Sequence, residues 1–154
     1  MIFRDNPTIN VSYNVAPGLL IKPEEVMEAP HTVYVNNFDE EASKLFIEDF
    51  TKATNSIQPI IPIIIDSYGG DVYSLLSMID VIENSSKPVA TICTGKAMSC
   101  GAILLSCGTK GHRYIGNHAT VMIHDVSAYS DGKFEEVKSN ARETTRLKKK
   151  CLIY

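Results

Sequence analysis

The sequence predicts an α/β fold built on a parallel sheet, and two observations lead to this prediction. Two short apolar runs rich in β-branched residues, 60–65 and 89–93, are typical of buried strands. A helical pattern follows each run, at 72–82 and from Ser99 to about Leu105. Strands that alternate with helices pair in parallel, because each crossover helix returns the chain to the same edge. With 154 residues, 44% of them hydrophobic, the chain suits one domain with its own core.

The first thirty residues differ from the rest because prolines interrupt them. Residues 1–30 contain four prolines and sustain no apolar period. Proline breaks helices and sheet ladders, so we expect an N-terminal arm with one or two short extended pieces. The domain proper is expected to span residues 31–154 and to begin with a short strand at 32–35.

The first helix is expected to begin after Asn37, which can act as its N-cap while Glu40 completes a capping box. Its apolar positions fall on one face: Ala42, Leu45, Phe46, Phe50 and Ala53. The run 60–65 is apolar throughout, so we expect a strand buried on both faces. The second helix ends at 85–88 and has an apolar face of its own: Val72, Leu75, Leu76, Ile79 and Ile82.

Shorter elements are expected after Leu105. A turn at 108–111 leads to short strands at 113–115 and 120–124, and a further strand with a turn at 131–132 is expected over 127–133. The last element is a charged helix that runs from Phe134 to about Lys150. Its apolar stripe consists of Phe134, Val137, Ala141 and Leu147 and is too thin for burial in a monomer core. The helix therefore either packs against another copy or is solvated.

Three features point to an acyl-transfer site. Ser99 follows a buried strand at a helix start, Gly69-Gly70 follow the preceding strand, and His124 ends a later apolar strand. Ligand sites of open α/β sheets lie at the carboxyl ends of the strands, so Gly69-Gly70 and Ser99 are expected on the same edge. A serine nucleophile needs a base and preorganised donors for the oxyanion. The plain alternative is that Ser99 caps the helix.

Four segments of the chain carry a resemblance to a known family: 66–70, 87–102, 108–114 and 121–124. Together they resemble ClpP, the family of proteolytic subunits of ATP-dependent Clp proteases. A looser resemblance runs from His31 to the end of the chain. The resemblance implies a crotonase-like spiral of β-β-α units with a C-terminal handle helix that is cut short here. It implies a serine-type endopeptidase that cleaves unfolded polypeptides, forms heptameric rings stacked in pairs, and receives substrate from an AAA+ unfoldase.

The resemblance also implies residue roles. Ser99 corresponds to the nucleophile and His124 to the general base, while the backbone N–H groups of Gly70 and Cys100 form the oxyanion hole. A side chain at Gly70 is expected to obstruct the approach of the oxyanion. The substrate is expected to lie as an added strand beside three further residues: Gly69, Ser127 and Gly132.

The third member of the family's triad is an acid that lies beyond the handle helix. This chain ends thirty residues after His124 and so stops before that position. Asp125 follows His124 directly, and neighbouring side chains of a strand point to opposite faces, so it is a poor substitute. Loss of the acid costs about ten-thousand-fold in turnover. We therefore expect a C-terminally incomplete domain that is weak or inactive and assembles poorly.

Bulk properties exclude several other classes. A net charge of −3 argues against a nucleic-acid partner, and no stretch has membrane-spanning length or the form of a signal peptide. The four cysteines lack metal-site spacing and are interpreted as reduced thiols of a cytoplasmic protein, without metal or cofactor. Two alternatives stay open. One is a catalytically impaired ClpP-like assembly subunit, and the other is a crotonase-type acyl-CoA enzyme that uses only the two backbone donors.

Overall fold

The computed structural model describes residues 30–124 and 133–151, which form a five-stranded sheet and four helices. The strands are β1 (Val33–Val35), β2 (Ile61–Ser67), β3 (Val89–Met98), β4 (Arg113–Ile115) and β5 (Thr120–Met122). The helices are α1 (Glu40–Asn55), α2 (Val72–Glu83), α3 (Cys100–Ser106) and α4 (Phe134–Cys151). The sheet order is β1-β2-β3-β4, β5 also pairs with β3, and every pairing is parallel. The predicted α/β fold with a parallel sheet is confirmed.

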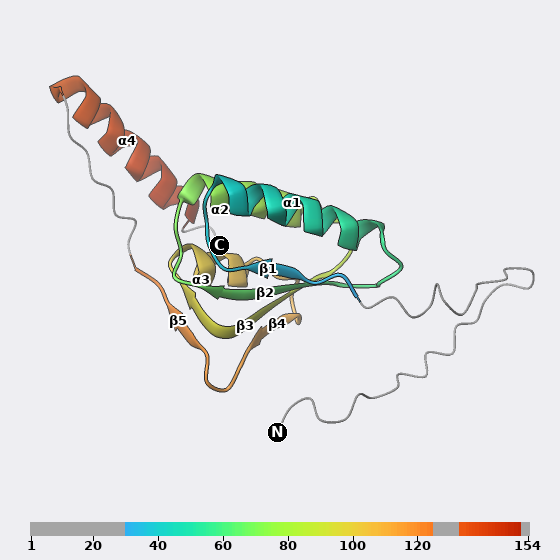
Figure 1. Ribbon diagram of the computed structural model, residues 1–154. Helices are drawn as coiled ribbons and strands as arrows, with labels where there is room; N and C mark the ends of the chain where they lie inside the picture. The colour runs from blue at the N-terminus through green and yellow to red at the C-terminus, as the bar shows by residue number, and fades with distance from the viewer. Residues whose placement is uncertain (1–29, 125–132, 152–154) are drawn as a thin grey trace, which may run out of the picture.

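The core lies between the sheet and the helices α1 and α2, which cover the same face of the sheet in Figure 1. Along β2 the side chains alternate: Ile61, Ile63 and Ile65 are fully buried, whereas Pro62 and Ile64 are half-buried. The expectation that this strand is buried on both faces is therefore wrong. The apolar run is uniform, but helices cover only one of the two faces that it presents.

The start of α1 corrects one prediction. Asp39, not Asn37, is the N-cap, and its side chain accepts the backbone N–H of Ala42 at 2.7 Å. Asn37 instead donates its side-chain amide to Asp39. The apolar face is also shifted, because Leu45 is 53% exposed and Ser43 takes a buried position beside Phe46. The cap lies two residues later than predicted, whereas Phe46, Phe50 and Ala53 are buried as expected.

The second helix agrees more closely with the predicted pattern. Asp71 is its N-cap and accepts the backbone N–H of Ser74 at 2.8 Å. Leu75, Ile79 and Ile82 are buried as expected, whereas Leu76 is half-buried and Met78 completes the buried face.

The third strand is longer than the sequence predicts. The expected strand 89–93 continues to Met98, so the residues between Cys93 and Ser99 are also extended chain. Ile65 pairs with Cys93 and Ser67 with Ala97, so β3 carries two more residues than β2 over this stretch. Such an irregularity bends a strand. The bend sits where β3 exchanges one neighbour, β4, for another, β5.

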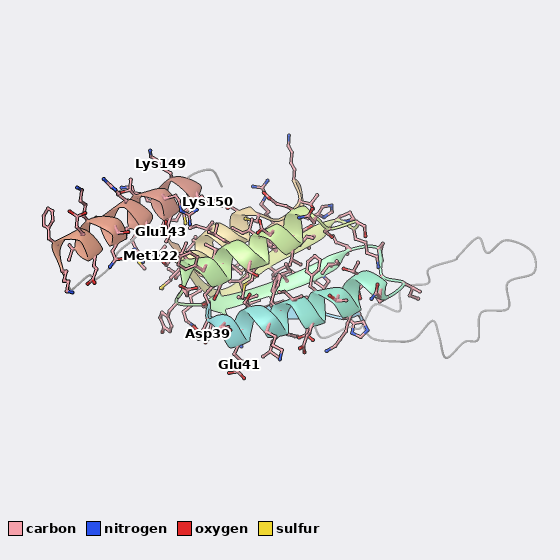
Figure 2. The ribbon with its side chains drawn as sticks, turned by 90° about the horizontal axis from the view of Figure 1, so that it is seen from above. Asp39, Glu41, Met122, Glu143, Lys149 and Lys150 are labelled. Carbon is pink, nitrogen blue, oxygen red and sulfur yellow. The ribbon has the colours of Figure 1, made fainter. Side chains whose placement is uncertain are left out.

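The last helix stands apart from the other three. α4 extends beyond the ends of α1 and α2 in Figures 1 and 2, and Leu147 is its one buried side chain among those described. Its predicted range is confirmed within one residue. The expectation of too thin an apolar stripe also agrees with the structure, since Phe134 is 77% exposed.

Several expectations lie outside the described residues. The predicted strand over 127–133 and two candidate site residues, Ser127 and Gly132, belong to the segment 125–132, and residues 1–29 of the expected arm are likewise not described. The predicted division at residue 30 stays a prediction. In the described ranges, no helix is both long and apolar enough to cross a bilayer.

Candidate active site

Ser99 forms the turn between β3 and α3 in a rare backbone conformation. Its φ is 54° and its ψ is −118°, and it is the one non-glycine residue with positive φ in the described part of the chain. Such a conformation is strained for a residue with a Cβ and is typical of a nucleophile elbow, where a strand turns sharply into a helix. Although Ser99 occupies the N-cap position, its side chain makes no capping hydrogen bond. The interpretation of Ser99 as an ordinary helix cap is therefore wrong.

The backbone of Ser99 is tied to the strand that leads to His124. Met98 pairs with Met122 in the parallel ladder of β3 and β5, and the Ser99 N–H donates to the Met122 carbonyl at 2.9 Å. His124 follows two residues later and is exposed. The pairing register, which sequence alone does not reveal, thus places Ser99 and His124 just beyond the carboxyl ends of two paired strands, β3 and β5.

Gly69 makes the closest approach to the Ser99 turn. Its φ is +102°, and a Cβ at this position would lie 2.7 Å from the Ser99 Cβ and 2.9 Å from the Met98 carbonyl oxygen. Its N–H donates to the hydroxyl of buried Ser67 at 3.1 Å. Only glycine fits both the conformation and the space. The expectation that Gly69-Gly70 and Ser99 share one edge is confirmed.

Gly70 has no room for a side chain, because it packs against the backbone of Phe38. A Cβ at Gly70 would collide with the carbonyl oxygen of Phe38, not with the Ser99 turn. The same Phe38 carbonyl accepts the Asp71 N–H at 2.8 Å, so β1 and its following residues support the Gly-Gly segment. The expectation that a side chain at Gly70 obstructs the oxyanion stays a prediction, and the clash that the structure shows is with Phe38, a residue remote in the chain.

Cys100 connects the serine turn to Gly70. Its thiol donates to the Gly70 carbonyl oxygen at 3.3 Å, and burial raises the pKa of this thiol. Cys100 is also the first residue of α3, and the first N–H groups of a helix have no acceptor within the helix. This contact holds the backbone at Cys100 against the backbone at Gly70, and the N–H groups of these two residues are the predicted oxyanion donors.

The chain is similar to known proteins over most of its length. The family model described as Clp protease matches residues 24–153 of the chain. The chain belongs to the Clp protease family. The parallel sheet with crossover helices agrees with this membership and with the fold that the sequence motifs predict.

Three curated relatives illustrate the extent of the similarity, and each is named ATP-dependent Clp protease proteolytic subunit. The chain is 39% identical to one from Bacteroides fragilis over 113 residues, which is 67% of this chain and 55% of the relative. It is 38% identical to one from Bacteroides thetaiotaomicron over 113 residues, 67% of the chain and 51% of the relative. Similarity to the Carsonella ruddii protein is 30% over 143 residues, 92% of the chain and 73% of the relative. The chain thus spans about half the length of the Bacteroides relatives that it matches.

One further group of residues at this edge was not assigned a role from the sequence. Lys96 forms an ion pair with Asp66 at 2.7 Å and lies 4.4 Å from the centre of the Tyr68 ring. The hydrogen bond from Lys96 lowers the pKa of Asp66, and the same bond raises the pKa of Lys96. The signal available in the sequence is a pair of opposite charges near the ends of adjacent predicted strands: Asp66 follows the strand 60–65 directly, and Lys96 lies three residues after the strand 89–93.

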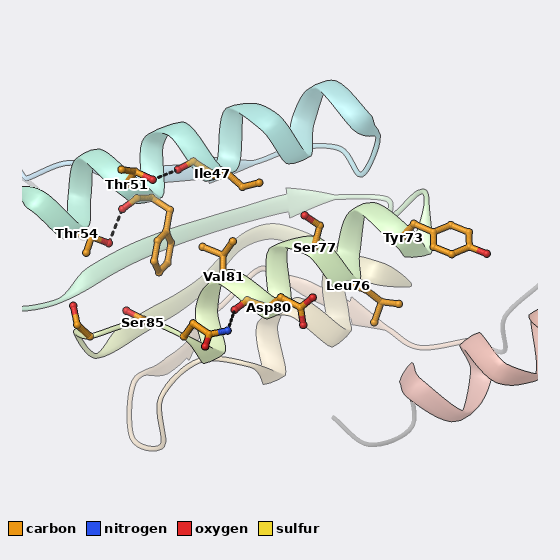
Figure 3. Close-up of a pocket in the computed structure, with 12 residues that line it drawn as sticks. Ile47, Thr51, Thr54, Tyr73, Leu76, Ser77, Asp80, Val81 and Ser85 are labelled. Carbon is orange, nitrogen blue, oxygen red and sulfur yellow. Dashed lines mark hydrogen bonds between the residues drawn. The ribbon is translucent and has the colours of Figure 1, made fainter.

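A hollow elsewhere on the molecule is separate from this site. A groove of about 700 Å³ lies between α1 and α2 and is lined by residues such as Thr51, Leu76 and Val81 (Figure 3). None of the candidate site residues that the structure describes lines it. In the ranges that the structure describes, no group of three or more His, Cys, Asp or Glu side chains is arranged to bind a metal ion.

Proposed function

We propose that this chain is a serine-type endopeptidase subunit of an ATP-dependent Clp-like protease and that it cleaves unfolded polypeptides by acyl transfer. The observation that carries the proposal is the strained Ser99 turn, whose N–H is bonded to the strand that leads to His124. Membership of the Clp protease family and the names of the relatives support the same activity.

In the proposed reaction, the Ser99 hydroxyl attacks the carbonyl carbon of a peptide bond while His124 takes its proton. Collapse of the tetrahedral intermediate breaks the C–N bond, and His124 returns the proton to the leaving amine. Water then hydrolyses the acyl ester with His124 acting again as the base. The chemistry requires the Ser99 Oγ to reach a ring nitrogen of His124 at about 2.6–3.2 Å once substrate is bound.

The oxyanion is proposed to be held by the backbone N–H groups of Gly70 and Cys100. The contact of the Cys100 thiol with the Gly70 carbonyl supports this assignment, because it keeps the two segments adjacent. Substrate is proposed to lie as an added strand beside Gly69 and the chain that follows His124, including Ser127 and Gly132. The acid that orients His124 is not assigned.

Assembly and partners are proposed from the family resemblance. Copies of the chain are expected to form heptameric rings that stack in pairs, with an AAA+ unfoldase delivering substrate in the cytoplasm. The exposed α4, which meets the rest of the chain through few side chains, is compatible with contacts to another copy. Sedimentation of the purified chain tests this part. Weak ring formation is expected, since the sequence predicts that this chain assembles poorly. A stable double ring would contradict poor assembly, and a species that remains monomeric at every concentration would contradict ring formation.

The activity is tested by intact-mass spectrometry after treatment with a fluorophosphonate probe, which phosphonylates an activated serine and releases fluoride. One adduct is expected for the wild-type chain, and none for Ser99→Ala. Ser106→Ala is the matched control, since this serine ends the same helix and donates its hydroxyl to the Ile103 carbonyl at 2.6 Å. It should label like the wild type. An adduct on Ser99→Ala would identify another nucleophile and overturn the assignment.

The two alternatives are distinguished by the probe experiment and by a binding experiment. A folded wild-type chain that takes no adduct would favour the catalytically impaired assembly subunit. Saturable binding of an acyl-CoA thioester would favour the crotonase-type enzyme, for which Ser99 has no role. The strained backbone at Ser99 argues against the second alternative, because two backbone donors alone do not require it.

A further inference from the structure

Strand β3 bends at residues 94–95, between the stretch that pairs with β4 and the stretch that pairs with β5, and we call this bend the corner of β3. The positions of the predicted catalytic residues depend on it. Residues 91–93 of β3 pair with β4, and residues 96–98 pair with β5. Between these stretches β3 has two more residues than its other neighbour, β2. Extra residues of this kind leave backbone groups without partners in the ladder. Something other than the ladder must hold the corner.

The side chain of Asp66 occupies this corner. Its Oδ1 accepts the backbone N–H of Lys96 at 3.2 Å and the Lys96 ammonium at 2.7 Å. A Cβ at Gly95 would lie 2.7 Å from the same oxygen, so the carboxylate packs directly against the backbone of the corner. The Lys96 ammonium also faces the Tyr68 ring, which shields one side of it. One carboxylate thus supplies the hydrogen bond that the ladder lacks.

The residues of the proposed site follow this ion pair on both strands. Gly69 comes three residues after Asp66, and Ser99 comes three residues after Lys96. Beyond the corner, Ala97 pairs with both Ser67 and Val121, so the strands that lead to the glycines, the serine and His124 meet at one residue. Any change in the angle of the corner moves these three strands relative to one another.

We propose that the Asp66–Lys96 ion pair is a positioning device for the active site, which fixes the corner of β3 and so sets Ser99 and His124 against Gly69-Gly70. The inference rests on the proposed peptidase function for its consequence in catalysis, although its structural part stands without it. Asp66 and Lys96 are positioning residues, because they act through the backbone of Ser99 and not on the substrate.

An ordinary surface ion pair would not have this effect, and the chain offers one for comparison. Asp49 and Lys52 form a pair at 2.8 Å within α1, with both side chains well exposed. Such pairs contribute little to a fold. The Asp66–Lys96 pair has nearly the same length but joins two strands and includes a backbone N–H. Asp49→Ala is therefore the matched control for Asp66→Ala.

The structural part is tested by amide hydrogen exchange of Ser99, whose N–H is bonded to the Met122 carbonyl. Asp66→Ala is expected to exchange at least about tenfold faster at this amide, because the corner opens more often. Asp66→Asn retains an oxygen that can accept the Lys96 N–H and should fall between the two. Asp49→Ala should match the wild type. Equal protection of Ser99 in Asp66→Ala and Asp49→Ala would overturn the proposal.

The catalytic part is tested by the rate at which the fluorophosphonate probe labels Ser99. Asp66→Ala is expected to react at least about tenfold more slowly, with partial recovery in Asp66→Asn, since a small displacement of a nucleophile costs much of its rate. If the wild type labels and Asp66→Ala labels equally fast, the positioning role is refuted while the peptidase function stands. If the wild type does not label, the function fails, and hydrogen exchange still decides the structural part.

Circular dichroism establishes first that each variant is folded. Should Asp66→Ala lose its fold, Lys96→Met replaces it, because this change removes only the ammonium and keeps the stem of the side chain. Faster exchange at Ser99 and slower labelling are expected for it as well. An unchanged rate in both measurements for Lys96→Met would contradict the proposed role of the ion pair.

Discussion

The sheet with its helices α1 to α3 and the helix α4 are held in place by different interactions. The first region has a continuous apolar core, in which strands β1 to β3 bury one face against α1 and α2. α4 buries one of its described side chains, Leu147, at 8% exposure. Burial of apolar area dominates folding free energy, whereas exposed polar contacts contribute little each. The edge of the sheet that carries Ser99 is therefore supported by the apolar core, whereas the position of α4 depends largely on a few polar contacts.

The polar contact that anchors α4 involves three side chains. Tyr73 of α2 donates its hydroxyl to Glu143 at 2.7 Å, and Arg146 donates to both carboxylate oxygens of Glu143 at 2.7 and 2.6 Å. The hydrogen bonds from Arg146 and then from Tyr73 lower the pKa of Glu143 to about 2. The hydrogen bond with Glu143 raises the pKa of Tyr73. α4 also contacts the rest of the chain through two apolar side chains: Leu147 is buried, and the half-buried Cys151 packs against the core.

The largest expected effect is loss of the core under α1. Phe46 is 1% exposed and stacks against Phe50, so Phe46→Ala should lower the free energy of unfolding by about 3–5 kcal/mol. Urea denaturation followed by circular dichroism measures it. The control is Phe134→Ala in α4, whose exposed ring should change the free energy by less than about 0.5 kcal/mol. Similar losses in both variants would remove the distinction between the two regions.

The next effect tests the close approach of two strands at the predicted site. Gly69→Ala should cost about 1–3 kcal/mol in strain and abolish labelling of Ser99, since its new methyl group would overlap the serine. Gly111→Ala is the matched control, because Gly111 also has positive φ, +87°, but no atom within 4 Å of the added carbon. It should lose stability and keep its labelling. Normal labelling in Gly69→Ala would contradict the contact with Ser99.

A smaller and more local effect is expected at the anchor of α4. Tyr73→Phe removes one hydrogen bond to Glu143 and leaves the ring in place. Hydrogen exchange within α4 should become faster, while the exchange of β2 and β3 and the urea midpoint stay unchanged. Mass spectrometry of peptides from the two regions measures both at once. A shift of the whole unfolding transition would mean that α4 and the core unfold as one unit.

The smallest expected effect is a difference in pH response between the two regions. The pKa of Glu143 is lower in the folded chain, about 2, than its ordinary value of 4.5. Its stabilising contribution is therefore complete above about pH 4.5 and is lost as the pH falls from there toward 2. Protection of α4 should decline in this window, and Glu143→Gln should abolish its dependence on pH there. A dependence that survives in Glu143→Gln would assign it to another group.

Much of the fold could be predicted from local pattern. The positions of α1, α2 and α4 and of the strands β1 and β4 follow from periodicity and punctuation within a few residues. Two of the wrong predictions show the limit of local pattern. The N-cap of α1 is Asp39 instead of Asn37, and β2 is covered on one face instead of two. A cap depends on which neighbour presents the better acceptor, and coverage depends on where other elements lie.

The order of strands and helices and the polar residues at their ends follow from the sequence, because they depend on interactions within a few residues of chain. The contacts between segments some thirty residues apart depend on tertiary structure. Gly69 meets Ser99 and Asp66 fills the corner at Lys96 only once β2 and β3 are in register, and Gly70 faces Phe38 through the pairing of β1 with β2. Register is set by burial of a whole face and by the extra residues of β3. No local pattern contains that information.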